Sequence, residues 1–234
     1  GEALGYMLEN RHIRAALGEA AQRQPRLKVI APVRVTGYGA DAGSAWVTLD
    51  NGETLRGRLV VAAEGRNSTV RASAGIRTNG WAYDQTAIVC TVAHQKPHDG
   101  VAHEYFLPSG PFAMLPLTRN RCNVVWTEKP AIAQTLMKMS EPDFVAELGA
   151  RFGSHLGALS MAGPRFAYPL SLKIAERFTG SRLALIGDAA HGVHPIAGQG
   201  LNVGLRDVAA LAECVVDAAK VGLDVGDAEA LARY

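Results

Sequence analysis

Residues 183–207 read LALIGDAAHGVHPIAGQGLNVGLRD, and this stretch decides the fold of the chain. Its first four residues are apolar and predict a short buried strand, while leucine and valine recur at helical spacing from about Gly200 onward. Asp188 and several glycines lie between these two elements. In sheets with parallel strands, ligands bind where a strand ends and the next helix begins. The stretch therefore predicts an α/β fold with a ligand site in this connection.

The residues of this connection suit a ligand that carries hydroxyl groups and a flat ring. Asp188 follows the strand and is placed to accept hydrogen bonds from sugar-type hydroxyls. Gly198 and Gly200 let main-chain N–H groups approach a ligand closely, at a helix N-terminus whose partial positive charge favours anionic groups. A redox-active ring that becomes anionic would suit this position. A tight turn with Asp188 as a helix cap is the alternative, and it explains the spaced string less well.

Gly198, Gly200 and Gly204 follow the pattern GxGxxxG. The fingerprint of dinucleotide-binding folds is GxGxxG directly after a strand, so this string is not that fingerprint. We therefore expect any pyrophosphate-binding βαβ unit to precede Gly1. Glycine is nevertheless enriched, with 25 glycines among 234 residues, which is about 11% against an average of about 7%.

The overall composition is that of a globular protein with one large or two small domains, with 48% hydrophobic and 20% charged residues. The 24 basic and 22 acidic residues are scattered along the chain and leave a formal charge of +2. Because binding to nucleic acid depends on massed positive charge, we expect no nucleic-acid partner.

Cysteine and histidine patterns give no sign of a metal site. The three cysteines are far apart and odd in number, which indicates neither a disulfide framework nor metal ligands. His94, His98 and His103 lie close in sequence but lack carboxylate partners at ligand spacing. No apolar run is long enough to span a bilayer, and the chain does not open with a secretion signal. We therefore expect a cytoplasmic protein, with peripheral contact with the inner membrane left open.

A second combination of strand, acidic residue, glycine and helix occurs at residues 59–74. The apolar run at 59–63 predicts a strand that is buried on both faces, and EGRNSTVR follows it. Ser68 is placed to cap a short helix, and Arg71 on that helix can hold a phosphate group. By itself this string fits a capped surface helix equally well. Two such combinations in one chain favour a binding role.

The remaining elements form α/β regions at both ends of the chain and a region of strands between them. We expect further helices at residues 1–22, 131–139, 142–152 and 227–234, and further strands at 27–30, 33–38, 45–49, 54–55, 86–93, 101–107, 112–117, 122–127 and 165–174. The order α/β, then sheet, then α/β predicts an antiparallel sheet domain inserted into an α/β domain, with boundaries near residues 78 and 176.

The string GDAAHGVHPIAGQGLNVGLRD resembles the Gly-Asp motif of the FAD-dependent aromatic hydroxylases, the class A flavoprotein monooxygenases. By this resemblance Asp188 contacts the ribityl chain or nearby hydroxyls of FAD. Pro195 faces the place where flavin and substrate meet and is the candidate catalytic residue. The motif also implies Gly187 as a cofactor-binding residue. It implies five more that border the isoalloxazine ring: Gly198, Gln199, Gly200, Leu201 and Asn202.

Two further strings carry the resemblance into other parts of the chain. EGRNSTVR is similar to the Asp-Gly motif of the family, which serves both FAD and NAD(P)H. It implies Glu64, Gly65 and Arg71 as cofactor-binding residues, with Glu64 standing where the family has aspartate. ENRHIRAAL at 9–17 resembles the FAD-contacting helix of the family, with Asn10 at the polar contact position.

YDQTAIVCTVAH at 83–94, together with HEYFLPSGPFAMLPL at 103–117, looks like the ubiquinone-biosynthesis branch of the family, the 2-polyprenyl-6-methoxyphenol hydroxylases. The resemblance implies an incomplete FAD/NAD(P)-binding Rossmann-like domain at 1–78 and 177–234, whose first part lacks the first βαβ unit. It implies an inserted antiparallel β-sheet domain at 79–176 that binds the substrate.

The activity implied by the resemblance is that of a flavin-dependent NAD(P)H monooxygenase. NAD(P)H reduces FAD, and O₂ supplies the oxygen that hydroxylates a polyprenyl phenol in ubiquinone biosynthesis. Two alternatives stay open. One is another FAD oxidoreductase of the same fold, a halogenase or a prenyl reductase, and the other is a non-catalytic lipid-binding or assembly module of a ubiquinone-biosynthesis complex. Because the GxGxxG unit is missing, we expect the 234-residue piece alone to be inactive and to bind FAD weakly or not at all.

Two further groups of residues are expected to be mainly structural. His191 and His194 flank the Gly-Asp pair, but hydroxylation chemistry belongs to the flavin, so we predict a structural role for both. Aromatic residues in the sheet region are predicted as core, with a few lining an apolar pocket for a ring with a greasy tail. These aromatic residues are Tyr105, Phe106, Phe112, Trp126, Phe166 and Tyr168.

Overall fold

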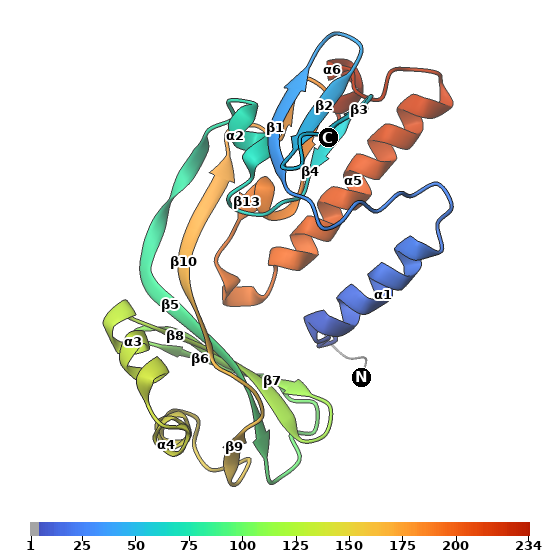
Figure 1. Ribbon diagram of the computed structural model, residues 1–234. Coiled ribbons are helices and arrows are strands. Elements are labelled where there is room, and N and C mark those ends of the chain that lie inside the picture. The colour runs from blue at the N-terminus through green and yellow to red at the C-terminus, as the bar shows by residue number, and fades with distance from the viewer. Residues whose placement is uncertain (1–4) are drawn as a thin grey trace. The chain divides into compact units, whose positions relative to one another are not determined.

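The computed structural model describes residues 5–234 and divides them into two compact units (Figure 1). The first unit contains residues 5–29 and 83–170, and the second contains residues 30–82 and 171–234. The chain passes between the units three times: between Val29 and Ile30, and inside two long strands, β5 (Thr78–His94) and β10 (Phe166–Ala175). The unit boundaries inside these strands follow residues 82 and 170, a few residues from the predicted boundaries near 78 and 176.

The central sheet of the second unit has the strand order β11-β12-β4. β4 (Val60–Ala62) and β12 (Leu183–Leu185) are parallel, and β11 (Thr179–Gly180) pairs with β12 in the antiparallel direction. The register places Leu185 opposite Ala62, so β4 and β12 end at the same edge of the sheet. The parallel pair confirms the predicted α/β class and brings together the two acidic loops that follow these strands.

The long helix α5 (Gly200–Lys220) covers one face of this sheet (Figure 1). Leu211 of α5 and Leu231 of α6 (Ala228–Leu231) pack against Ala184 of β12. On the other face, a core of eight buried residues includes Leu183 and Leu185 of β12 and Val70 of the short helix α2 (Thr69–Ser73). Burial on both faces explains why β12 is a continuous apolar run. The helix predicted at 227–234 is confined to the four residues of α6.

Two strand predictions need correction. The run at 59–63 forms β4, but Val61 is 42% exposed, because among the described strands β4 pairs only with β12. The run at 27–30 forms no strand at all, and Leu27 and Val29 are 52% and 66% exposed. A short apolar run becomes a strand only when another strand pairs with it, and the residues themselves do not show whether one will.

Two smaller groups of strands complete the second unit. β1 (Val35–Ala40), β2 (Ala45–Leu49) and β3 (Thr54–Gly57) form an antiparallel meander, close to the predicted positions. The two-residue strand β13 (His191–Gly192) pairs with β10, with His191 opposite Ile174. This pairing ties the connection between β12 and α5 to a neighbouring strand.

The first unit is an antiparallel sheet packed against two helices. β8 lies between β5 and β7, β6 extends the sheet beyond β7, and β9 pairs with the end of β5. The bounds are β6 (His103–Leu107), β7 (Gly110–Leu117), β8 (Arg121–Glu128), β9 (Leu159–Met161), α3 (Pro130–Lys138) and α4 (Glu141–Phe152). These elements confirm the predicted antiparallel sheet.

Trp126 lies at the centre of the core of this first unit. Its side chain is fully buried, and its ring centroid lies 5.8 Å from that of Phe112 and 5.6 Å from that of Phe144. The prediction that sheet aromatics form the core is confirmed for Phe112 and Trp126. The aromatics that stay outside the core are Phe106, Phe166 and Tyr168, which are 74%, 50% and 53% exposed.

The first helix, α1 (Asn10–Gln22), begins later than the predicted range of 1–22. Residues 5–9 are not helical, and the part of the prediction on residues 1–4 lies outside the described residues. The Glu9 carboxylate just before α1 accepts a hydrogen bond from Arg121 Nη2 of β8 at 3.0 Å. Because α1 groups with the sheet unit, the assignment of all residues 1–78 to one FAD-binding part stays a prediction.

Candidate functional site

The Gly-Asp loop, residues 187–198, connects β12 to α5. It contains two short 3-10 turns, Gly187–Ala189 and Pro195–Ala197. Gly198 ends the second turn with φ of +59°, in the left-handed region that glycine adopts without steric cost. This turn sends the chain directly into α5. The predicted order of strand, acidic residue, glycine turn and long helix is therefore confirmed.

Asp207 holds the Gly-Asp loop against α5. Its Oδ2 accepts a hydrogen bond from the Gly187 N–H at 2.8 Å and one from Nε2 of His191 at 2.6 Å. Both side chains are largely buried, with 15% of Asp207 and 9% of His191 exposed. The edge of the His191 ring also packs on Phe178, with centroids 5.8 Å apart. The structure thus gives His191 the structural role that was predicted, with Asp207 as a partner that was not.

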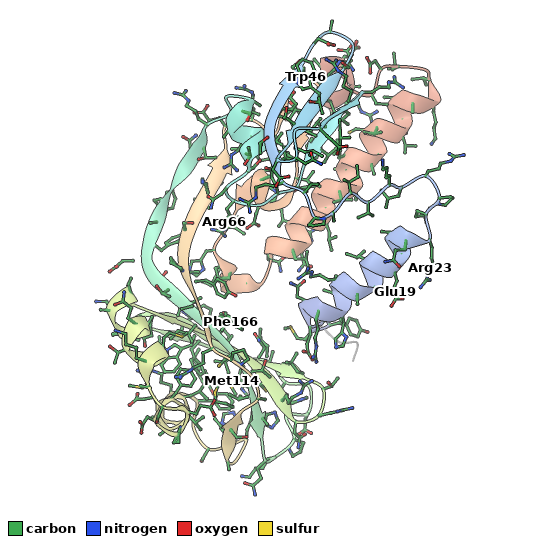
Figure 2. The ribbon with its side chains drawn as sticks, viewed as in Figure 1. Glu19, Arg23, Trp46, Arg66, Met114 and Phe166 are labelled. Atoms are coloured by element: carbon green, nitrogen blue, oxygen red, sulfur yellow. The ribbon has the colours of Figure 1, made fainter. Side chains whose placement is uncertain are left out.

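Arg66, labelled in Figure 2, contacts the same loop from the segment that follows β4. Its Nε donates to Oδ2 of Asp188 at 3.0 Å, and its Nη2 donates to the carbonyl oxygen of Val193 at 2.6 Å. Its Nη1 donates to both the carbonyl and the hydroxyl oxygen of Ser171 in β10, at 2.7 and 3.0 Å. Arg66 is not among the residues predicted from the sequence, where its only signal is its position two residues after Glu64.

Glu64 and Arg71 make internal contacts in the loop after β4. The Glu64 carboxylate accepts hydrogen bonds from the Thr69 N–H and the Ser68 hydroxyl, at 2.8 and 3.0 Å, and so caps α2. Arg71 is buried, and its two terminal nitrogens donate to the carbonyl oxygens of Ala189 and Arg66, each at 2.8 Å. These contacts join the two acidic loops. A direct role for either side chain in cofactor binding stays a prediction.

The surface formed by Asp188 and the start of α5 fits a ligand such as FAD. The Asp188 side chain is 42% exposed, and in the described part of the chain its Oδ1 has no hydrogen-bond donor. No side chain caps the first turn of α5, whose N–H groups lack partners within the helix. Leu201 on that turn is 55% exposed. A free carboxylate oxygen suits hydroxyl groups. Uncapped N–H groups suit an electron-rich ring edge, and an exposed apolar side chain suits a ring face.

Other predicted residues lie around this surface or in the other unit. Pro195 opens the second turn of the loop, directly after His194. Burial and the positive charge of Arg66 lower the pKa of His194, which keeps its Nδ1 able to accept the Ile196 N–H at 3.1 Å. Asn10 is the first residue of α1 and belongs to the first unit, and its role in cofactor binding stays a prediction.

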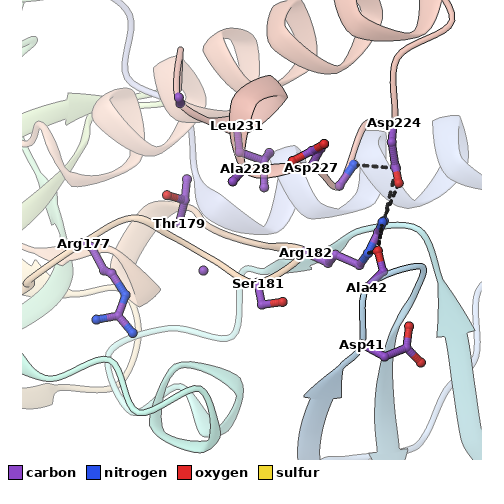
Figure 3. Close-up of a pocket in the computed structure, with 13 residues that line it drawn as sticks. Asp41, Ala42, Arg177, Thr179, Ser181, Arg182, Asp224, Asp227, Ala228 and Leu231 are labelled. Atoms are coloured by element: carbon purple, nitrogen blue, oxygen red, sulfur yellow. Dashed lines mark hydrogen bonds and ion pairs between the residues drawn. The ribbon is translucent and has the colours of Figure 1, made fainter.

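A pocket of about 640 Å³ lies elsewhere in the second unit, and none of the predicted cofactor residues lines it (Figure 3). At one side of it, Arg182 forms an ion pair with Asp224 and donates to the carbonyl oxygens of Ala42 and Arg58. The Gly226 N–H donates to the same Asp224 carboxylate at 3.1 Å. Because the Arg182 guanidinium already uses its donors within the protein, we assign the Arg182–Asp224 cluster to stability rather than to ligand binding.

The Arg182–Asp224 pair makes a pH-dependent contribution to stability. Hydrogen bonds from Arg182 and Gly226 hold the pKa of Asp224 well below its usual value of 3.8. A carboxylate with a depressed folded pKa stabilises the fold above about pH 4 and loses that contribution as the pH falls through the folded value. We expect Asp224→Asn to lower the thermal unfolding midpoint by a few degrees at about pH 7, and the difference to shrink towards about pH 2.

The matched control for this prediction is Glu229→Gln, which removes an exposed carboxylate from neighbouring α6. Circular dichroism melts of the three proteins across the pH range provide the measurement. An equal loss for Asp224→Asn at neutral and at acidic pH would show that the carboxylate charge is not the stabilising feature.

Comparisons with known proteins agree with this geometry. The chain is 51% identical over 231 residues to "Ubiquinone hydroxylase UbiL" of Rhodospirillum rubrum and 36% identical over 231 residues to "3-demethoxyubiquinol 3-hydroxylase" of Escherichia coli. Each alignment covers 99% of this chain, but only 54% and 59% of those relatives, so the chain spans little more than half their length.

The crystal structure of p-nitrophenol 4-monooxygenase PnpA from Pseudomonas putida shares the fold, with a TM-score of 0.76 and 23% identity over 96% of this chain and 57% of that one. The profile of a protein family described as "FAD binding domain" matches residues 6–229. This match takes in both units, from before α1 to within α6, and includes the Gly-Asp loop. The chain therefore belongs to the FAD-binding domain family.

Proposed function

We propose that the protein containing this chain is an FAD-dependent monooxygenase that hydroxylates a polyprenyl phenol in ubiquinone biosynthesis, with NAD(P)H and O₂ as cosubstrates. The observation that carries the proposal is the exposed Asp188 carboxylate, in a loop that leads into a helix whose first turn has no side-chain cap. It occurs in a chain that is 51% identical to a relative named as a ubiquinone hydroxylase.

Bound FAD would supply the redox chemistry, and the residues of this chain would bind and orient it. In this proposal Oδ1 of Asp188 accepts a hydrogen bond from a ribityl hydroxyl. The first-turn N–H groups of α5, with Gly198 and Gly200 leaving the backbone accessible, approach the electron-rich edge of the ring. Pro195 lies at the junction of flavin and substrate.

The exposed aromatic side chains of the first unit support an apolar substrate. Phe166 and Tyr168 on β10 stack with ring centroids 6.5 Å apart, although each is about half exposed. Phe106 on β6 is 74% exposed. Exposed aromatic rings on a sheet suit contact with a phenol ring or a polyprenyl chain, because both bury apolar surface on binding.

A polyprenyl substrate would also place the protein near lipid. Within residues 5–234, no helix combines the length and the apolar character that crossing a bilayer requires. Because a polyprenyl chain is apolar, we propose peripheral contact with the inner membrane. We also propose membership of a ubiquinone-biosynthesis complex. Co-sedimentation with vesicles that contain the polyprenyl phenol, but not with vesicles that lack it, would support membrane contact through the substrate.

The proposed activity is tested with the natural full-length protein, purified with its flavin. We expect a polyprenyl phenol to stimulate NAD(P)H oxidation and to gain one oxygen atom from isotopically labelled O₂, detected by mass spectrometry. The same assay without substrate is the control for uncoupled oxidation.

Three other results would contradict hydroxylation. A chlorinated product in the presence of chloride would indicate a halogenase, and loss of a prenyl double bond would indicate a reductase. A full-length protein that contains no flavin and forms no product would indicate the non-catalytic module.

A further inference from the structure

Arg66 joins three separate segments of the second unit. Its guanidinium contacts Asp188 and Val193 of the Gly-Asp loop and Ser171 of β10, with four hydrogen bonds of 2.6–3.0 Å. The loop that carries Arg66 follows β4, so the residue spans from one strand end of the parallel pair to the other. An arginine whose Nε, Nη1 and Nη2 all donate hydrogen bonds within the protein is held in one orientation.

The backbone opposite Arg66 leaves room for its side chain. Gly192 lies in β13, and a Cβ added at this position would lie only 3.0 Å from both Cγ and Nε of Arg66. A side chain at position 192 would therefore require the Arg66 side chain to move by a few tenths of an ångström. The lack of a side chain at Gly192 therefore lets Arg66 keep the position from which it contacts Asp188.

The hydrogen-bond pattern leaves half of the Asp188 carboxylate available. Nε of Arg66 holds Oδ2, while the terminal nitrogens of Arg66 are used by Ser171 and Val193. Oδ1 has no donor in the described part of the chain, and the Asp188 side chain is 42% exposed. A carboxylate held by one oxygen presents the other in a constant direction, which reduces the side-chain entropy lost when a ligand binds.

The neighbouring Arg71 does not share the contact that Arg66 makes with Asp188. It lies five residues later and is also bound within the loops, but its terminal nitrogens contact only the carbonyl oxygens of Ala189 and Arg66. Arg71 therefore supports the backbone, whereas Arg66 touches the one acidic side chain that faces outward at the end of β12.

From this geometry we propose that Arg66 is a positioning residue that orients the Asp188 carboxylate towards the hydroxyl-bearing chain of a bound flavin. The proposal rests on the proposed function, because it takes the ligand to be a flavin. According to the proposal, Arg66 strengthens binding of the polyhydroxyl chain of the flavin and does not affect binding of the ring.

Flavins with and without the hydroxyl chain test this assignment. Riboflavin carries a ribityl chain, and lumiflavin has the same ring with a methyl group in its place. We expect Arg66→Gln in the full-length apoprotein to weaken riboflavin binding by about tenfold or more, the effect of losing a charge-assisted hydrogen bond, and to change lumiflavin binding by less than about twofold. Quenching of flavin fluorescence gives both dissociation constants.

Two further variants make the test specific. If Arg66 acts through Asp188, the double variant Arg66→Gln, Asp188→Asn binds riboflavin no more weakly than Asp188→Asn alone. Arg77→Gln is the matched control, because Arg77 is 84% exposed, pairs only with Glu176 on the surface and belongs to the same unit. It should leave both flavins unaffected.

Several outcomes would overturn the proposal. Equal weakening of riboflavin and lumiflavin would mean that Arg66 supports the loop in general, and multiplied losses in the double variant would mean that it acts independently of Asp188. If Arg66→Gln does not fold, Arg66→Lys decides, because lysine keeps the charge but cannot bond to Asp188, Ser171 and Val193 together. Riboflavin binding of Arg66→Lys equal to wild type would then refute the proposal. A wild-type protein that binds neither riboflavin, lumiflavin nor FAD would instead refute the proposed function itself.

Discussion

Replacing Asp207 with alanine is expected to lower the free energy of unfolding by about 2–4 kcal/mol, because a partly buried donor and a buried donor lose their acceptor together. Those donors are the Gly187 N–H and the Nε2 group of His191. The loss is severe because Nδ1 of His191 is buried and already has no hydrogen-bond partner in the described structure. Without Asp207, both ring nitrogens would be buried and unpaired. Flavin binding should weaken as well, since the Gly-Asp loop would no longer be held against α5.

Urea unfolding followed by circular dichroism measures this effect. The matched control is Asp217→Ala on the same helix, where the carboxylate is 41% exposed and pairs with the exposed Arg233 at 3.4 Å. Exposed ion pairs contribute about 0–1 kcal/mol, so this variant should stay close to wild type. Similar losses for the two variants would show that Asp207 acts only as one more charge on α5.

Replacing Trp126 with alanine is expected to destabilise the protein by about 3–5 kcal/mol, the usual cost of removing a large aromatic side chain from a core. Trp126 is fully buried between Phe112 and Phe144, and the Arg151 guanidinium lies 4.4 Å from its ring centroid. Its indole N–H also donates to the buried Glu128 carboxylate at 3.2 Å. The variant would therefore leave both a cavity and a buried carboxylate that has lost a donor.

The control for this second prediction is Phe106→Ala, which removes a 74% exposed aromatic from the same antiparallel sheet. Surface substitutions of this kind usually change stability by about 0.5 kcal/mol or less. Differential scanning calorimetry of both variants would show whether the loss follows burial. A small loss for Trp126→Ala would mean that the core of the first unit collapses onto the space without strain.

Local pattern was sufficient to predict the elements that surround the site. The apolar run at 183–186, the glycines after it and the helical spacing from Gly200 each reflect interactions between residues close in sequence. The resulting strand, loop and helix are present as β12, the Gly-Asp loop and α5. The same reasoning placed β4 and α2, and with them the second acidic loop.

Local pattern was insufficient wherever a partner comes from far along the chain. Arg66 lies 122 residues from Asp188, and no spacing rule connects them. β5 begins eight residues before the predicted range of 86–93, because pairing, rather than composition, determines how long a strand continues. The segment at 27–30 shows the converse, since without such pairing it does not become a strand.

The sequence by itself determined the α/β class, the family resemblance and the identity of Asp188 as the acidic residue at the end of a buried strand. Only the tertiary structure decided which side chains orient that residue. The parallel pairing of β4 with β12 brings Arg66 to Asp188, and the packing of α5 brings Asp207 to Gly187 and His191. The physical reason is that hydrogen bonds depend on distance in space, and chain folding makes neighbours of residues whose separation in sequence carries no information about their contact.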